Sequence, residues 1–102
     1  MMETEAMTYA AEARVPTELS RRYLAQLCKH FQHKLPVTLE ETHGHIAFPS
    51  GDCDVTAEEG TLVLRVAARE ESALPGLQDV VARHLERFAF REKPEIRWQR
   101  ME

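Results

Sequence analysis

The chain has 102 residues, of which 43% are hydrophobic and 29% are charged, which is the composition of a folded globular protein. This length predicts one domain with a hydrophobic core of its own, because compact domains cluster near this size. The formal net charge of −4 argues against a general nucleic-acid binder, and the lack of an apolar run of about 18 residues argues against a membrane span.

The N-terminus is expected to contribute a tail and one strand. Residues 1–8 carry few large apolar groups, so we expect a flexible tail there, followed by a single α+β domain over residues 9–102. Tyr9 to Val15 alternate weakly between apolar and polar side chains. This pattern predicts a short edge strand that ends at Pro16, which lacks the N–H group of a sheet interior.

A helix is predicted next, with Thr17 as its N-cap and Pro36 beyond its end near Lys34. Its last turns are rich in cationic and imidazole side chains, which favour the carbonyl end of a helix. Its apolar residues recur at helical spacing and predict the buried face: Leu24, Leu27 and Phe31.

Four short strands follow, and their short connections require an antiparallel meander. The turn from Glu41 to Gly44 is expected to use the glycine for a positive φ. Residues of alternating apolar character predict the inner rows of these strands: Val37 and Leu39; Ile46 and Phe48; Cys53 and Val55; Leu62, Leu64 and Val66.

A second helix is predicted after Ser72, its expected N-cap, from an apolar stripe of helical period that comprises Leu74, Leu77, Val81, Leu85 and Phe88. Ile96 and Trp98 then alternate with polar residues and predict a final strand. The fold class is therefore α+β: an antiparallel sheet with two helices packed on one face, in the order β-α-β-β-β-β-α-β.

Charge is unevenly distributed along the chain. Residues 14–34 carry five basic side chains against one acid, whereas residues 35–64 carry six acids and no lysine or arginine. This asymmetry, or an exposed edge strand, could pair two copies into a homodimer, although solvated faces are the favoured explanation of the asymmetry. Two cysteines without a secretory signal predict a cytoplasmic protein with free thiols.

The stretch from Leu24 to Ile46 is the best candidate for a functional site, because four of the five histidines fall there. If the end of the first helix meets the following hairpin, imidazoles and a lysine could share one polar site that takes a small anionic ligand. The residues expected to contribute from this stretch are Cys28, His30, Lys34, His43 and His45.

A metal site is not expected. Cys28, His30 and His33 point in different directions around a helix, and the paired spacings of structural zinc sites do not occur. Cys28 and Cys53 both fall at core positions, where a free thiol behaves as a small apolar group. No cofactor is predicted.

The chain closely resembles the small bacterial domain-of-unknown-function 2218 family in the segments YLAQLCKHFQHKLPV, ETHGHIAFPSGDCDV, LQDVVARHLERFAFRE and IRWQR. The resemblance covers about Tyr9 to Arg100 and implies a cytoplasmic bacterial protein of unassigned activity. Members also resemble modules attached to siderophore-interacting ferric reductases, which implies a context of iron handling. By position, the resemblance implies a polar signature here of Cys28, His30, Lys34, His43, His84 and Arg91.

The leading hypothesis is a non-enzymatic binding or accessory module, linked to iron or siderophore metabolism, whose partner is a small anion or a siderophore-handling protein. Two alternatives stay open. One is a small enzyme that uses His30 or His43 as an acid or base, and the other is a metal-binding protein.

Overall fold

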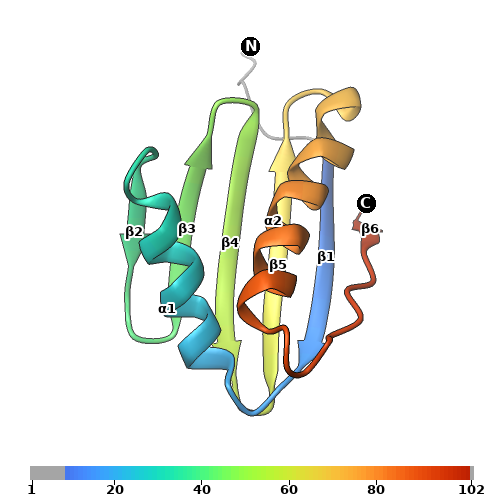
Figure 1. Cartoon of the computed structure of the whole chain (residues 1–102). Helices are drawn as coiled ribbons and strands as arrows, with labels where there is room; N and C mark the ends of the chain where they lie inside the picture. The colour runs from blue at the N-terminus through green and yellow to red at the C-terminus, as the bar shows by residue number, and fades with distance from the viewer. Residues whose placement is uncertain (1–8, 102) are drawn as a thin grey trace.

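The computed structural model describes residues 9–101, which form one six-stranded sheet and two α-helices in two layers (Figure 1). In chain order the elements are β1 (Tyr9–Pro16), α1 (Ser20–Phe31), β2 (Val37–Leu39), β3 (His43–Phe48), β4 (Gly51–Glu58), β5 (Thr61–Ala68), the 3-10 turn η1 (Glu71–Ala73), α2 (Leu74–Phe88) and β6 (Gln99–Met101). The predicted α+β class and element order are confirmed. The expected tail over residues 1–8 lies outside the described residues. No helix within the described part of the chain is long and apolar enough to cross a membrane.

The strands lie in the order β2-β3-β4-β5-β1-β6, and every neighbouring pair is antiparallel. The predicted meander from β2 to β5 is confirmed. The prediction of an edge strand at β1 is wrong, because β1 pairs with β5 along its whole length and β6 pairs with Ala10 to Glu12 on its other side. The alternation of β1 is weak in sequence because its buried row contains two alanines, Ala11 and Ala13.

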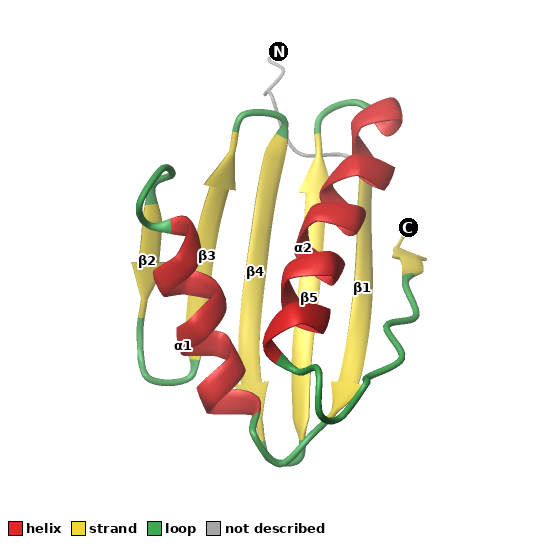
Figure 2. Ribbon diagram, viewed as in Figure 1, coloured by secondary structure: helices red, strands yellow, loops and turns green. Residues whose placement is uncertain are grey.

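Both helices cover the same face of the sheet, α1 over β3 and β4 and α2 mainly over β5 (Figure 2). The inner row of β5 is fully buried beneath them: Leu62, Leu64 and Val66. Because side chains alternate along a strand, every second residue faces the side that the helices leave uncovered. We call this side the open face. Its central row runs across five strands through Thr38, His45, Asp54, Arg65 and Glu12.

Gly44 lies inside β3, not in a turn as predicted, and its role is close packing. A Cβ atom at this position would lie closer than 3.0 Å to Cys28 Sγ and 3.0 Å from Leu24 Cδ1, both on α1. The positive φ among the described glycines belongs to Gly60, at 74°, in the tight turn between β4 and β5. Gly44 therefore lets α1 approach the sheet.

The element ends differ from the predictions in three places. α1 begins at Ser20 with Leu19 at the N-cap position, so Thr17 is not its cap; Thr17 Oγ1 instead accepts a hydrogen bond from Leu19 N–H at 3.0 Å. α2 begins at Leu74, after η1, so Ser72 is not its cap. The last strand is β6, and the predicted strand residues Ile96 and Trp98 instead pack against the core from an irregular segment.

Candidate functional site

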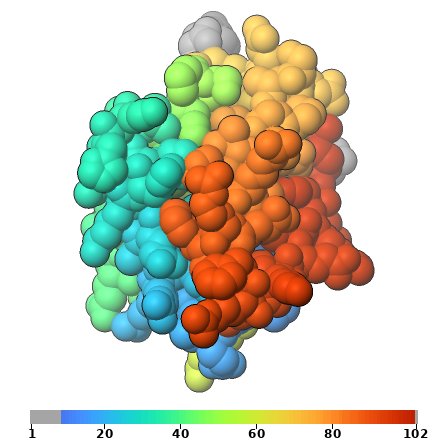
Figure 3. Space-filling view, viewed as in Figure 1, coloured from blue at the N-terminus to red at the C-terminus, as the bar shows by residue number. Residues whose placement is uncertain are grey.

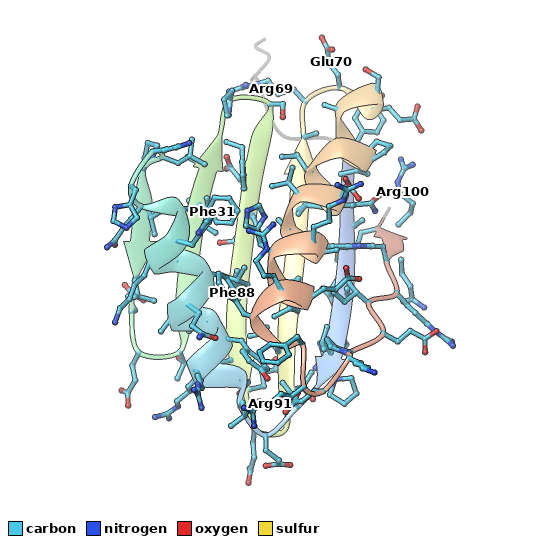
Figure 4. The ribbon with its side chains drawn as sticks, viewed as in Figure 1. Phe31, Arg69, Glu70, Phe88, Arg91 and Arg100 are labelled. Atoms are coloured by element: carbon cyan, nitrogen blue, oxygen red, sulfur yellow. The ribbon has the colours of Figure 1, made fainter. Side chains whose placement is uncertain are left out.

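Two histidines meet where α1 and α2 lie side by side. The imidazole of His30, on α1, lies 4.6 Å from that of His84, on α2, measured between ring centroids. Phe31 lies 4.8 Å from His84, and Phe88 lies 5.9 Å from His30. Figure 4 shows Phe31 and Phe88 along this seam between the helices, and Figure 3 shows α1 (cyan) and α2 (orange) in contact along it. The two imidazoles are thus held within an aromatic cluster.

Hydrogen bonds and neighbouring charges act on these two rings. His84 Nδ1 donates a hydrogen bond to the carbonyl oxygen of Val80 at 2.7 Å, because a carbonyl oxygen can only accept. Partial burial lowers the pKa of His30 below its ordinary value of 6.5, and the positive charges of His84 and Arg87 lower it further. His30 is therefore neutral at pH 7.

A hollow of about 420 Å³ opens beside this pair at the end of α1. We call it the His30 hollow. Phe31 and Leu35 give it apolar walls, and Lys34 and His33 stand at its rim. An ammonium group beside apolar and aromatic walls suits a flat molecule with a negative charge. The residues that line it are His30, Phe31, His33, Lys34, Leu35 and His84.

A second group of histidines lies on the open face of the sheet. The nearest ring nitrogens of His43 and His45 lie 2.9 Å and 3.0 Å from the same atom, Asp54 Oδ1. His45 Nε2 also lies 3.4 Å from Asp52 Oδ2. Among the described residues no three His, Cys, Asp or Glu side chains are placed to hold a metal ion together. These side chains form a hydrogen-bonded cluster on β3 and β4.

Three comparisons with known proteins bear on this chain. A model of a family described as uncharacterised proteins conserved in bacteria, DUF2218, matches residues 12–99. The chain belongs to this family. It is also similar to PA4090 from Pseudomonas aeruginosa, whose NMR structure shares 36% sequence identity, covers 90% of this chain and 96% of that chain, and has a TM-score of 0.78. No curated protein matches the chain.

The expected convergence of the candidate residues on one site is wrong for this DUF2218 protein. The end of α1 does meet β3, since Cys28 packs over Gly44. However, Gly44 faces the helix, and the period of two along a strand then directs His43 and His45 to the open face. The sheet therefore separates these two histidines from His30 and Lys34.

The other two candidates also stand apart from the His30 hollow. Cys28 is fully buried, and burial raises the pKa of its thiol, so it is neither exposed nor readily ionised. Arg91 lies beyond the end of α2 (Figure 4), and it lines a different hollow from Lys34. Of the six candidate residues, the structure brings together His30 and Lys34 at the His30 hollow, and His43 and His45 at Asp54 on the open face.

Sequence reasoning named His84 only in the polar signature that the family resemblance implies, and it did not place His84 against His30. The available signal was its place on the border of the apolar stripe of α2, four residues before Phe88. That spacing shows which helix face carries both side chains. It does not show which residues of α1 they meet, because the contact depends on how two helices cross.

Proposed function

We propose that this DUF2218 protein is a non-enzymatic binding module whose His30 hollow takes a small aromatic anion. The observation that carries the proposal is the unneutralised charge at the hollow: no ion pair to Lys34 occurs among residues 9–101. Some other cations of the described residues are paired, as in Arg14 with Glu58 at 2.6 Å and Arg21 with Glu41 at 3.1 Å. A cation beside apolar walls is suited to a carboxylate or catecholate on an aromatic ring.

The absence of a catalytic partner favours binding over chemistry at this place. Among the described side chains, neither His30 nor His84 hydrogen-bonds to a hydroxyl, thiol or carboxylate. His84 Nδ1 instead donates its hydrogen bond to a backbone carbonyl. A general base normally needs such a partner to activate or orient it. The two rings instead supply flat walls for a ligand.

The resemblance to modules of siderophore-interacting proteins directs the choice of ligand. We propose catecholate groups of ferric siderophores as the ligand class, a siderophore-handling protein as the partner, and the bacterial cytoplasm as the location. Two buried free thiols are consistent with a reducing compartment.

The test is calorimetric titration with 2,3-dihydroxybenzoate and with its diamagnetic gallium(III) complex. Lys34→Gln should weaken binding about three- to tenfold, because a charge-assisted hydrogen bond is lost from a partly solvated position. Lys29→Gln is the matched control, because it also removes one positive charge but Lys29 lies on α1 outside the hollow. It should change the affinity much less. Equal effects of the two variants, or no heat at millimolar ligand, would refute the proposal.

A small enzyme is the second candidate function, and the observation that favours it is the contact of His43 with Asp54 at 2.9 Å. A carboxylate that orients an imidazole is the usual support for a general base. Screening for hydrolysis of model esters and phosphate esters with His43→Gln as the comparison tests this candidate. Activity that His43→Gln leaves unchanged would eliminate it.

A further inference from the structure

A second hollow, of about 530 Å³, lies at the other end of the seam between α1 and α2. We call it the Arg91 hollow. It opens where the first half of α1 faces the segment after α2, and its walls include the rings of Tyr23, Phe88 and Phe90. Phe90 is 64% exposed, an unusual position for a large apolar ring in a small protein. The Arg91 hollow thus offers an aromatic surface to a ligand.

Two guanidinium groups border the Arg91 hollow without a carboxylate partner. Arg22 and Arg91 both line it, and no ion pair to either occurs in the described part of the chain. Glu92 also lines the hollow, and its carboxylate accepts a hydrogen bond from the hydroxyl of Thr17 at 2.8 Å. Arg91 lies over the Phe90 ring, with 5.7 Å between Cζ and the ring centroid. The two guanidinium groups outnumber the one carboxylate at the hollow, so a net positive charge remains there for an anion from outside.

A buried amide oxygen supplies an independent observation at the same place. Gln26 lines the Arg91 hollow, and its Oε1 atom is buried without a hydrogen-bond donor among the described residues. Buried acceptors are nearly always paired in proteins, and an unpaired one costs about 1–3 kcal/mol. The terminal amide torsion of glutamine is broad, so this amide is free to turn toward a ligand in the hollow that it lines. A ligand that carries an O–H or N–H group would satisfy it.

We infer that the Arg91 hollow binds a small 2-hydroxy carboxylate in which the carbon next to the carboxylate carries both a hydroxyl group and an aromatic ring. Arg22 and Arg91 hold the carboxylate, Gln26 accepts a hydrogen bond from the hydroxyl, and the ring of the ligand packs against Phe90. The ring contact between Phe88 and His30 separates this site from the His30 hollow. Its ligand differs as well, because the buried acceptor without a partner among residues 9–101, Gln26 Oε1, belongs to a residue that lines the Arg91 hollow and not the His30 hollow.

The test compares two ligands that differ by one hydroxyl, mandelate and phenylacetate, in titrations of the full chain followed by amide NMR. We expect mandelate to bind about tenfold more tightly than phenylacetate, with shifts centred on Gln26, Phe90 and Arg91. Gln26→Met keeps the length of the side chain but removes the acceptor, so it should abolish the preference for mandelate. Arg91→Gln should weaken both ligands about tenfold, whereas Arg87→Gln, outside the hollow, should leave both nearly unchanged.

The comparison on the unmodified protein tests the inference even if a variant fails to fold. Equal affinities for mandelate and phenylacetate, or no shift at Gln26 and Phe90 at millimolar ligand, would overturn it. Shifts confined to Lys34 and His84 would place the ligands in the His30 hollow, which overturns this inference but leaves the proposed function intact.

Discussion

Replacing Gly44 by alanine perturbs the contact on which the placement of α1 depends. The added Cβ would lie closer than 3.0 Å to Cys28 Sγ and 3.0 Å from Leu24 Cδ1, whereas ordinary carbon contacts are about 3.5–4.0 Å. Either α1 or β3 must then move by roughly 1 Å, because Cys28 and Leu24 are buried side chains with little room to yield. The clash involves side chains alone, so it can be relieved by a second substitution.

The expected cost of Gly44→Ala is about 1–3 kcal/mol in the free energy of unfolding, the usual range for overpacking, less about 0.4–1 kcal/mol gained by restricting the unfolded chain. Cys28→Ala alone should cost about 1 kcal/mol, for a cavity the size of one sulfur atom. In the double variant the new methyl group occupies that cavity. We therefore expect the double variant to lose about 1–2 kcal/mol less than the sum of the losses of the two single variants.

Urea denaturation at 25 °C measures all four members of this cycle, and unchanged m values establish that the transitions remain comparable. Gly76→Ala is the control: nothing lies within 4 Å of its added Cβ, and it sits in the first turns of α2, so it should stabilise the protein by about 0.5–1 kcal/mol. Additive costs of Gly44→Ala and Cys28→Ala would refute the argument that α1 is packed against β3 at this glycine.

Three further predictions follow from the same structure. Gly51→Ala should cost more than Gly44→Ala, because its Cβ meets a backbone carbonyl, that of Ala67, which cannot rotate away; urea denaturation ranks the two. The His30 ring should titrate below pH 6.5 in an NMR titration. Because the unfolded state then binds more protons than the folded state, the free energy of unfolding should fall as the pH drops through and below 6.5. His30→Gln should reduce that fall. Cys28 and Cys53 should react with Ellman's reagent only after unfolding, because burial raises the pKa of both thiols; rapid reaction of the folded protein would contradict this.

Pairing of two copies stays a prediction. Light scattering at low and high salt distinguishes its two origins: a dimer held by the uneven charge should dissociate in salt, whereas strand pairing at the edge should persist. A monomer at both salt concentrations would contradict pairing.

Local patterns in the sequence predict much of the fold, because most elements depend on a period that each segment carries by itself. The inner rows of β4 and β5, from Cys53 to Val66, follow from alternation, and the buried faces of both helices follow from helical spacing. The place of β1 does not follow, because its pairing with β6 joins segments that are about ninety residues apart in sequence. Gly44 was assigned to a turn because a glycine in the sequence can indicate either a turn or a place where another element packs closely against the backbone.

The candidate site was harder to predict because it depends on the direction of side chains across two layers. His43 and His45 are near Cys28 in the backbone path, but one residue of register decides which face of the sheet they occupy. Proximity in sequence therefore grouped residues that the sheet keeps apart. The contact of His30 with His84 spans 54 positions and becomes visible only once the crossing of α1 and α2 is known.

The central claim is that the helix-covered side of this DUF2218 protein, and not its open face, carries the ligand site. Amide NMR mapping of 2,3-dihydroxybenzoate on the unmodified protein tests this claim most directly. We predict that the shifted residues cluster around Lys34, Leu35 and His84, while His43 and His45 stay unchanged. Shifts centred on His43 and His45, with none at Lys34, would contradict the account.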